Sequence, residues 1–252
     1  MRRLDLILVD QHKVSSRSRA QRLISESKVK VRQFGDWKTP VKAGQKYPDG
    51  IEIDICQDEA DQFASRGGIK LAGALEVSGI SLMGAIVIDV GQSTGGFTDC
   101  ALRAGASKVV GVDVGHSQLK ESLRNDPGVV CLEGVNARSL PESLLDFTEF
   151  RQGYDLAVVD VSFISQTKVL PSLVPLLKQG GQLLSLVKPQ FEVGLGGLGK
   201  GGIVRDSSLY SEVEKFIKAC CIGLGLNIRG YFDSSITGGD GNREFFIWAQ
   251  RS

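Results

Sequence analysis

The chain has 252 residues, of which 42% are hydrophobic and 23% charged, enough to bury the cores of one small and one ordinary domain. Its longest apolar runs are far shorter than the ~20 residues that a membrane-spanning helix needs, and the stretch Met1–Asp5 meets an acid too early for a signal peptide. Five cysteines without a C-x-x-C pair, together with two histidines, indicate neither a zinc site nor a disulfide framework. We therefore expect a cytoplasmic protein with no bound metal and no membrane partner.

The net charge of +1 is unevenly distributed along the chain. Residues 1–46 hold 12 Lys and Arg against 4 Asp and Glu, which leaves +8 for this segment and −7 for the remainder. A small basic head on a mildly acidic body is typical of a phosphate-binding module attached to another domain. A solvated charged surface is the alternative, but the excess of positive charge is confined to one segment, which favours binding to nucleic acid.

The first predicted helix begins after a pair of serines. Either Ser15 or Ser16 can cap it, and Ala20, Leu23 and Ile24 form its apolar inner face. The spacing of Arg19 and Arg22 places two guanidinium groups at neighbouring positions of one helical face.

Two short strands are predicted after this helix. Residues 28–31 alternate lysine with valine, and residues 51–55 form a second strand-like run. A basic helix, a tight turn and a basic hairpin within residues 2–48 resemble the S4 RNA-binding module. In that family the helix and the following strand grip the phosphates of folded RNA. The resemblance therefore implies RNA binding by Arg3, Arg17, Arg19, Arg22, Lys28 and Lys30.

The composition turns acidic over residues 49–64, which we interpret as a strand end and a linker. This predicts an S4-like α+β domain with its linker at residues 1–60 and a second domain at residues 61–252. In the second domain, β-rich runs alternate with helix-length segments, which is the pattern of a doubly wound α/β sheet. The gap between the last two strands is too short for a helical crossover, so we expect them to pair antiparallel. The predicted strands are 85–90, 108–113, 129–132, 156–161, 182–187, 228–232 and 244–249.

A glycine-rich loop, residues 91–96, follows the first strand of this sheet and precedes a helix. A strand, a glycine turn and a helix start form a cradle for an anion or a cofactor. A dinucleotide fingerprint needs glycine where this chain has Ser93, so an NAD site is the weaker alternative. Asp113, about twenty residues downstream, can hydrogen-bond both ribose hydroxyls of an adenosine.

The loop D-x-G-x-x-x-G-G at residues 89–96 resembles the first motif of class I S-adenosylmethionine-dependent methyltransferases. The resemblance implies a Rossmann-like, mostly parallel sheet with an antiparallel last strand, and S-adenosyl-L-methionine as the cofactor. The residues expected to bind it are Asp89, Gly91, Ser93, Thr94, Gly95, Gly96, Phe97, Asp113, Asn136, Ala137 and Asp160.

The segment after the fourth predicted strand narrows the choice of acceptor atom. Enzymes that methylate exocyclic amines of bases carry N/D-P-P-Y/F there, whereas this chain has D-V-S-F at residues 160–163. Methylation of cytosine C5 needs a thiolate nucleophile beside the target base. No cysteine stands directly after the fourth or fifth predicted strand. With these two classes of methyl acceptor disfavoured, an oxygen atom remains as the acceptor of the methyl group.

Long motifs extend this interpretation over essentially the whole chain. They are S-R-G-G-x-K-L (65–71), D-V-G-x-S-T-G-G-F-T-D (89–99), D-V-G (113–115), N-A-R (136–138), D-V-S-F-I-S (160–165), L-V-K-P-Q-F-E (186–192), K-G-G-x-V-R-D (200–206) and G-N-x-E-F (241–245). These motifs resemble the TlyA family, S4-headed RNA methyltransferases whose members have also been called haemolysins. The resemblance implies methylation of a ribose 2′-hydroxyl in ribosomal RNA, at a cytidine and with the large subunit favoured. One departure is Gln92, which stands where the family usually has a small residue.

Within these motifs, Lys70, Asp160, Lys188 and Glu244 match the catalytic tetrad of the FtsJ-type ribose 2′-O-methyltransferases in order and in topological position. A ribose hydroxyl must lose its proton as it attacks a methyl group, and an ordinary protonated lysine cannot accept that proton. Burial and a second cation nearby both favour a neutral amine. We therefore hypothesise that Lys188 is the proton acceptor and that Lys70 is the neighbouring cation, which also holds the ribose.

The two acids complete this hypothesis. Asp160 would orient Lys188 and offset the charge of the sulfonium, and Glu244 would position Lys70. Two alternatives stay open at this point: an RNA-binding protein that has kept the fold without the activity, and a haemolysin that acts on membranes.

Overall fold

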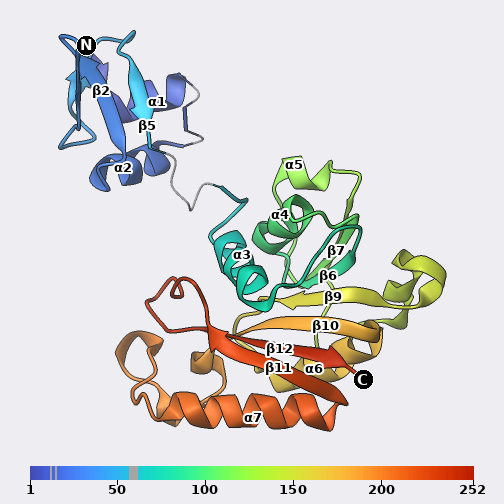
Figure 1. The fold of residues 1–252 in the computed structure, drawn as a ribbon. Helices are drawn as coiled ribbons and strands as arrows, with labels where there is room; N and C mark the ends of the chain where they lie inside the picture. The colour runs from blue at the N-terminus through green and yellow to red at the C-terminus, as the bar shows by residue number, and fades with distance from the viewer. Residues whose placement is uncertain (12, 15, 57–61) are drawn as a thin grey trace. The chain divides into compact units, whose positions relative to one another are not determined.

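The computed structural model describes residues 1–11, 13–14, 16–56 and 62–252. The chain divides into two compact units, Met1–Gln62 and Phe63–Ser252 (Figure 1). The predicted domain boundary after residue 60 and the acidic stretch 58–61 of the predicted linker lie outside the described residues, as does Ser15. Among the described residues, no helix has the length and apolar character that crossing a membrane requires.

The N-terminal unit packs two short helices against short antiparallel strands. Helix α2 begins where the sequence predicts it, because the Ser16 side chain accepts a hydrogen bond from the backbone N–H of Arg19 at 3.3 Å. Helix α1 was not expected, and its buried Leu4, Ile7 and Leu8 follow the helical spacing of three and four residues. The elements are β1 (Arg2–Arg3), α1 (Leu4–Asp10), α2 (Arg17–Ser25), β2 (Val29–Gln33), β3 (Asp36–Lys38), β4 (Lys46–Tyr47) and β5 (Ile53–Ile55).

A fully buried carboxylate, Asp5, ties the N-terminal unit together. Arg3 and Arg17 each donate to it at 2.9 Å, and the Gln21 amide donates at 2.8 Å. The hydrogen bond from Arg3 is the largest of the effects that hold the pKa of Asp5 far below its usual range, against the opposing effect of burial. The start of the chain is thereby fixed to α2.

The C-terminal unit is built on a mostly parallel sheet, as the sequence predicts. Among the described residues seven strands pair in the order β11-β12-β10-β9-β6-β7-β8, and β12 runs antiparallel to both of its neighbours. The helices and strands are α3 (Gly67–Ser78), β6 (Ile86–Val90), α4 (Gly96–Arg103), β7 (Lys108–Asp113), α5 (Glu121–Arg124), β8 (Val129–Glu133), β9 (Tyr154–Val159), α6 (Leu170–Leu173), β10 (Leu177–Val187), α7 (Leu209–Gly223), β11 (Leu226–Asp233) and β12 (Phe245–Arg251). Short 3₁₀ turns occupy Glu142–Phe147, Glu149–Arg151, Gln166–Lys168, Val174–Leu176, Pro189–Phe191, Leu195–Gly197 and Lys200–Gly202.

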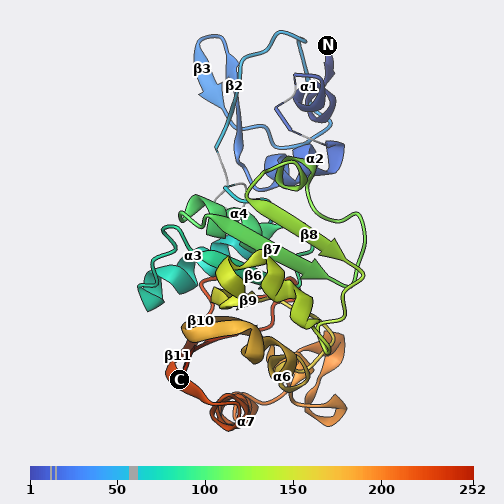
Figure 2. The same cartoon turned by 90° about the vertical axis from the view of Figure 1, so that its right-hand side faces the viewer.

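Helices cover both faces of this sheet (Figure 2). Val87 packs in one cluster with Leu71 of α3, whereas the next residue of the same strand, Ile88, packs in another with Ile217 of α7. Such double burial is why the central strands contain nearly continuous apolar runs. The parallel arrangement brings the carboxyl ends of β6, β7, β9 and β10 to one edge of the sheet, where the loops that carry polar residues emerge.

Candidate active site

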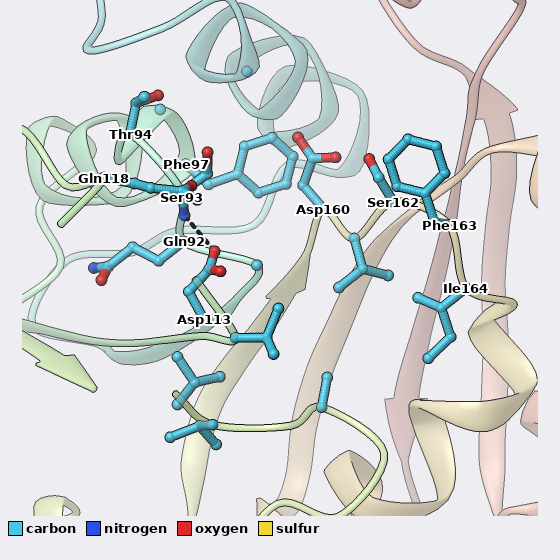
Figure 3. Close-up of a pocket in the computed structure, with 18 of the residues that line it drawn as sticks. Gln92, Ser93, Thr94, Phe97, Asp113, Gln118, Asp160, Ser162, Phe163 and Ile164 are labelled. Atoms are coloured by element: carbon cyan, nitrogen blue, oxygen red, sulfur yellow. Dashed lines mark hydrogen bonds between the residues drawn. The ribbon is translucent and has the colours of Figure 1, made fainter. Parts of the chain in front are cut away.

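A pocket of about 680 Å³ lies at this edge, between the ends of β6, β7 and β9 (Figure 3). Its volume is in the range of small-molecule sites. Of the residues predicted from the sequence, Gly91, Ser93, Thr94, Gly96, Phe97, Asp113, Asn136, Ala137, Asp160, Lys70 and Lys188 line it. The other predicted residues of this unit, Asp89, Gly95 and Glu244, are buried and do not line it.

The loop after β6 needs glycine for two reasons. Gly91 has φ +89°, and a Cβ added to it would stand 2.4 Å from the carbonyl oxygen of Asp160. Glycine alone adopts this backbone conformation readily and permits such close approach. The loop of β6 therefore lies directly against the loop of β9, which places Asp160 beside the glycine turn.

Asp113 is held at the pocket wall by backbone groups. Its Oδ2 atom accepts from the N–H of Ser93 at 2.7 Å, the contact drawn in Figure 3, and its Oδ1 atom accepts from the N–H of Gly115 at 2.7 Å. An ionised carboxylate has about four acceptor positions. The remaining positions suit the two hydroxyls of a ribose.

Asp89 lies beneath the glycine loop and is fully buried. The Thr98 hydroxyl donates to its Oδ2 atom at 2.7 Å, and the Gln92 amide donates to that hydroxyl at 3.0 Å. Burial raises the pKa of Asp89 to about 7. The same geometry accounts for Gln92, because its amide fills the space above Gly111, where a Cβ would stand 2.0 Å from it. Hydrogen bonds among Asp89, Thr98 and Gln92 thereby support the glycine loop.

The four residues of the predicted tetrad form two ion pairs. The Nζ atom of Lys70 is 2.6 Å from Oε2 of Glu244, and the Nζ atom of Lys188 is 2.6 Å from Oδ1 of Asp160. Both lysine side chains are 11% exposed. Lys188 also donates to the Ser162 hydroxyl at 3.0 Å.

Helix α3 brings the first pair to the pocket. A Cβ at Gly67, at the start of α3, would lie 3.6 Å from Oδ2 of Asp160, so this helix end packs on the second pair. Lys70 follows one turn later and lines the pocket with Lys188 and Asp160. The arrangement offers two amines and a carboxylate to one cavity, which suits proton transfer beside a cationic centre.

Several pocket residues were not predicted. They include Ser162 and Phe163 of the D-V-S-F-I-S motif, and Phe163 is 88% exposed at φ +63° with its ring 5.1 Å from that of Phe191. The motif was noticed in the sequence, but residue type gave these two side chains no role. The other lining residues without a predicted role are Ser65, Gly67, Gln92, Val112, Val114, Gln118, Val135, Arg138, Val161 and Ile164.

Several of the basic residues of the N-terminal unit have acidic partners within that unit. Arg3 and Arg17 bind Asp5, as described above, while Lys28 lies 3.0 Å and Arg22 3.9 Å from Glu26. Lys30 stands on the exposed face of β2. Arg19 is half-buried on α2. The residues predicted to bind RNA thus lie on β1, on α2, on β2 and directly before β2.

Comparison with known proteins agrees with this geometry. The model of the FtsJ-like methyltransferases matches residues 63–251, and that of the S4 domain matches residues 2–31. The chain is 40% identical to the 16S/23S rRNA (cytidine-2′-O)-methyltransferase TlyA of Mycobacterium tuberculosis strain CDC 1551, over 98% of this chain and 88% of that protein. It is 37% identical to Hemolysin A of Brachyspira hyodysenteriae, over 96% and 97% of the two chains.

Solved structures show the same relationship. A candidate hemolysin from Streptococcus thermophilus superposes with a TM-score of 0.75 at 39% identity, over 99% of this chain and 88% of that one. An S-adenosylmethionine-dependent methyltransferase from Mesorhizobium loti shares the fold, with a TM-score of 0.53 at 15% identity, over 72% of this chain and 98% of that one. The chain therefore belongs to the FtsJ-like methyltransferase family and, within it, to the S4-headed TlyA proteins.

Proposed function

We propose that this protein transfers a methyl group from S-adenosylmethionine to the ribose 2′-hydroxyl of a cytidine in ribosomal RNA, with the large subunit favoured. The observation that carries the proposal is the convergence of Lys70, Asp160 and Lys188 on one pocket, beside the glycine loop of β6. The TlyA relative of Mycobacterium tuberculosis has this activity in its name, at 40% identity.

The residues of the pocket fit the cofactor. Gly91 and Gly96 allow close approach of the backbone, and Asp113 presents free acceptor positions to a ribose. Asp160 contributes a negative charge on the side of the pocket where Lys188 lies. When bound, S-adenosylmethionine supplies an electrophilic methyl group on a sulfonium, whose positive charge a carboxylate stabilises.

In the proposed reaction the 2′-oxygen forms a bond to the methyl carbon, the carbon–sulfur bond breaks, and the hydroxyl proton leaves. Lys188, in its neutral form, is the group that accepts this proton, and Asp160 orients it at 2.6 Å. Lys70, fixed by Glu244 at 2.6 Å, holds the ribose.

The N-terminal unit is the proposed RNA-binding module. The S4 match covers residues 2–31, which include Arg3, Arg17, Arg19, Arg22, Lys28 and Lys30. Cationic side chains of this kind neutralise backbone phosphates and position an RNA without reading its sequence. The choice of nucleotide would then depend on how this module and the pocket engage the folded RNA together.

The test is transfer of tritiated methyl from S-adenosylmethionine to purified ribosomal subunits that lack the modification, followed by mapping of the labelled ribose. We expect label on a cytidine 2′-oxygen of large-subunit RNA. Label on a base or on protein, or no label with either subunit while the cofactor is bound, would contradict the proposal. Label on small-subunit RNA alone would contradict only the choice of subunit.

A further inference from the structure

The carboxylate of Glu192 bridges the two loops that carry the catalytic pair Asp160 and Lys188. Its Oε1 atom accepts from the backbone N–H of Gln166 at 2.8 Å, and its Oε2 atom accepts from the Ser165 hydroxyl at 2.6 Å. Burial raises the pKa of Glu192, and both donors oppose that rise by stabilising the charged form. Glu192 does not line the pocket. Its contacts are with the loop of β9, although it follows β10.

A second set of contacts fastens the same point of the β9 loop to strand β10. Gln166 is 2% exposed, and its side-chain amide donates to the carbonyl of Leu186 at 2.9 Å while its Oε1 atom accepts from the Ser185 hydroxyl at 2.7 Å. The backbone and the side chain of Gln166 are therefore both used to hold the loop. A buried amide with all these partners is costly to displace.

The segment 160–164, which precedes Ser165 and Gln166 in the β9 loop, lines the pocket beside Lys188 (Figure 3). Lys188 contacts Asp160 and Ser162 at one end of the two loops, and the rings of Phe163 and Phe191 meet midway at 5.1 Å. Glu192 joins the two loops at their other end, through its bonds to Ser165 and Gln166. The two loops are thus joined at both ends, and the segment 160–164 is held between them.

We propose that Glu192 is a positioning residue for methyl transfer, one that fixes the β9 loop so that Asp160 and Ser162 meet Lys188. This inference rests on the proposed function. Loss of the carboxylate would leave the Gln166 N–H without its acceptor and would remove the bond from the Ser165 hydroxyl to residue 192, and the loop would move to satisfy the buried N–H. A displacement of about 1 Å at catalytic groups lowers a rate by roughly 10²-fold.

The test compares two substitutions of Glu192. In Glu192→Gln the amide oxygen can accept from Gln166 and the amide N–H can donate to the Ser165 oxygen, so we expect kcat to stay within about threefold of the original. Glu192→Leu has a similar volume and neither hydrogen bond, and we expect kcat to fall roughly 10²-fold. The dissociation constant of S-adenosylhomocysteine and the KM for the cofactor should stay unchanged in both. Rescue by glutamine and an effect confined to kcat distinguish positioning from a role in folding.

A matched control is Glu142→Leu, because Glu142 is 82% exposed in its pair with Arg151 and lies outside the pocket; its kcat should not change. If Glu192→Leu does not fold, Ser165→Ala removes the bond to Glu192, together with the contacts of the same hydroxyl with Thr167, and should lower kcat about tenfold at constant KM. If Glu192→Leu or Ser165→Ala keeps the original kcat, or loses kcat only in proportion to the fraction that binds S-adenosylhomocysteine, the inference is overturned. Absence of transfer by the unmodified protein in the same assay would instead refute the proposed function.

Discussion

Lys70 and Glu244 are 174 residues apart in the chain, and their Nζ and Oε2 atoms are 2.6 Å apart in a buried ion pair. Lys70 comes from α3, which precedes the sheet, and Glu244 directly precedes β12, the last strand described. The pair therefore joins the two ends of the C-terminal unit at the pocket. Its loss should affect both stability and activity, and the two effects can be separated.

Glu244→Ala should lower the free energy of unfolding by about 3–5 kcal/mol, because it leaves the Lys70 ammonium buried without a counter-ion. The double variant Lys70→Met/Glu244→Leu should recover most of this loss, since no unpaired charge remains, but it should not transfer methyl groups. Urea unfolding and the tritium assay measure the two properties. Activity in the double variant would show that neither side chain is needed for the reaction.

Lys188→Ala should abolish methyl transfer while S-adenosylhomocysteine still binds, because the lysine is the proposed proton acceptor and the residues proposed to bind the cofactor lie on other loops. Isothermal calorimetry measures the binding, and single-turnover transfer measures the chemistry. Transfer at the original rate would remove Lys188 from the mechanism.

Gly91→Ala should lower both stability and the affinity for S-adenosylhomocysteine, because its Cβ would stand 2.4 Å from the Asp160 carbonyl oxygen. Gly79→Ala is the matched control: Gly79 also has a positive φ, +67°, but its Cβ would meet nothing within 4 Å. The control should cost about 1 kcal/mol of backbone strain with no change in affinity. Equal effects of the two substitutions on calorimetric affinity would contradict the close contact.

The buried Asp89 should make the protein less stable as the pH rises. Its pKa is raised to about 7 in the folded state, so its contribution is full below the unfolded value of ~3.9 and is lost between that pH and about 7. Asp89→Asn should remove this part of the pH dependence. Thermal unfolding at pH 5 and pH 8 measures it, and an identical difference in Tm for the two proteins would speak against a protonated Asp89.

Asp5 should have the opposite effect on the N-terminal unit. Its pKa is held far below the usual range, first by the hydrogen bond from Arg3, so its contribution is present at neutral pH and is lost as the pH falls below ~4. Asp5→Asn should therefore accelerate hydrogen exchange over residues 4–25 at pH 7, with no change over β6–β10. Unchanged exchange in this segment would contradict the role of Asp5.

Sequence reasoning succeeded where a residue type and its local position carry the signal. The strand-end acids, the glycine loop and the lysines of the motifs could be located because parallel topology brings such positions to one edge of the sheet. Strand β10 was expected to begin at residue 182, but it begins at Leu177 because a register shift carries it past Gly180 and Gly181. In a sequence, glycine residues at a bulge resemble the turn residues that end a strand.

What the sequence could not provide are partners that meet through tertiary packing. Nothing local in the sequence links Asp5 to Arg17, or Glu192 to Gln166, and both acids would pass for surface charges. Helix α1 was missed for a related reason. Its seven residues are too short for the apolar period to stand out from a strand-like run.

Strand β12 lies between β10 and β11, so the last strand in the chain is an interior strand of the sheet and not an edge strand. A polypeptide terminated before residue 244 would keep the loops of β6, β7 and β9, yet β11 would lose its neighbour and β10 would present an uncovered row of amide and carbonyl groups. Such rows recruit other chains. A premature stop codon near the 3′ end of the coding sequence should therefore yield an insoluble product, and cells carrying it would lose the protein through aggregation and proteolysis.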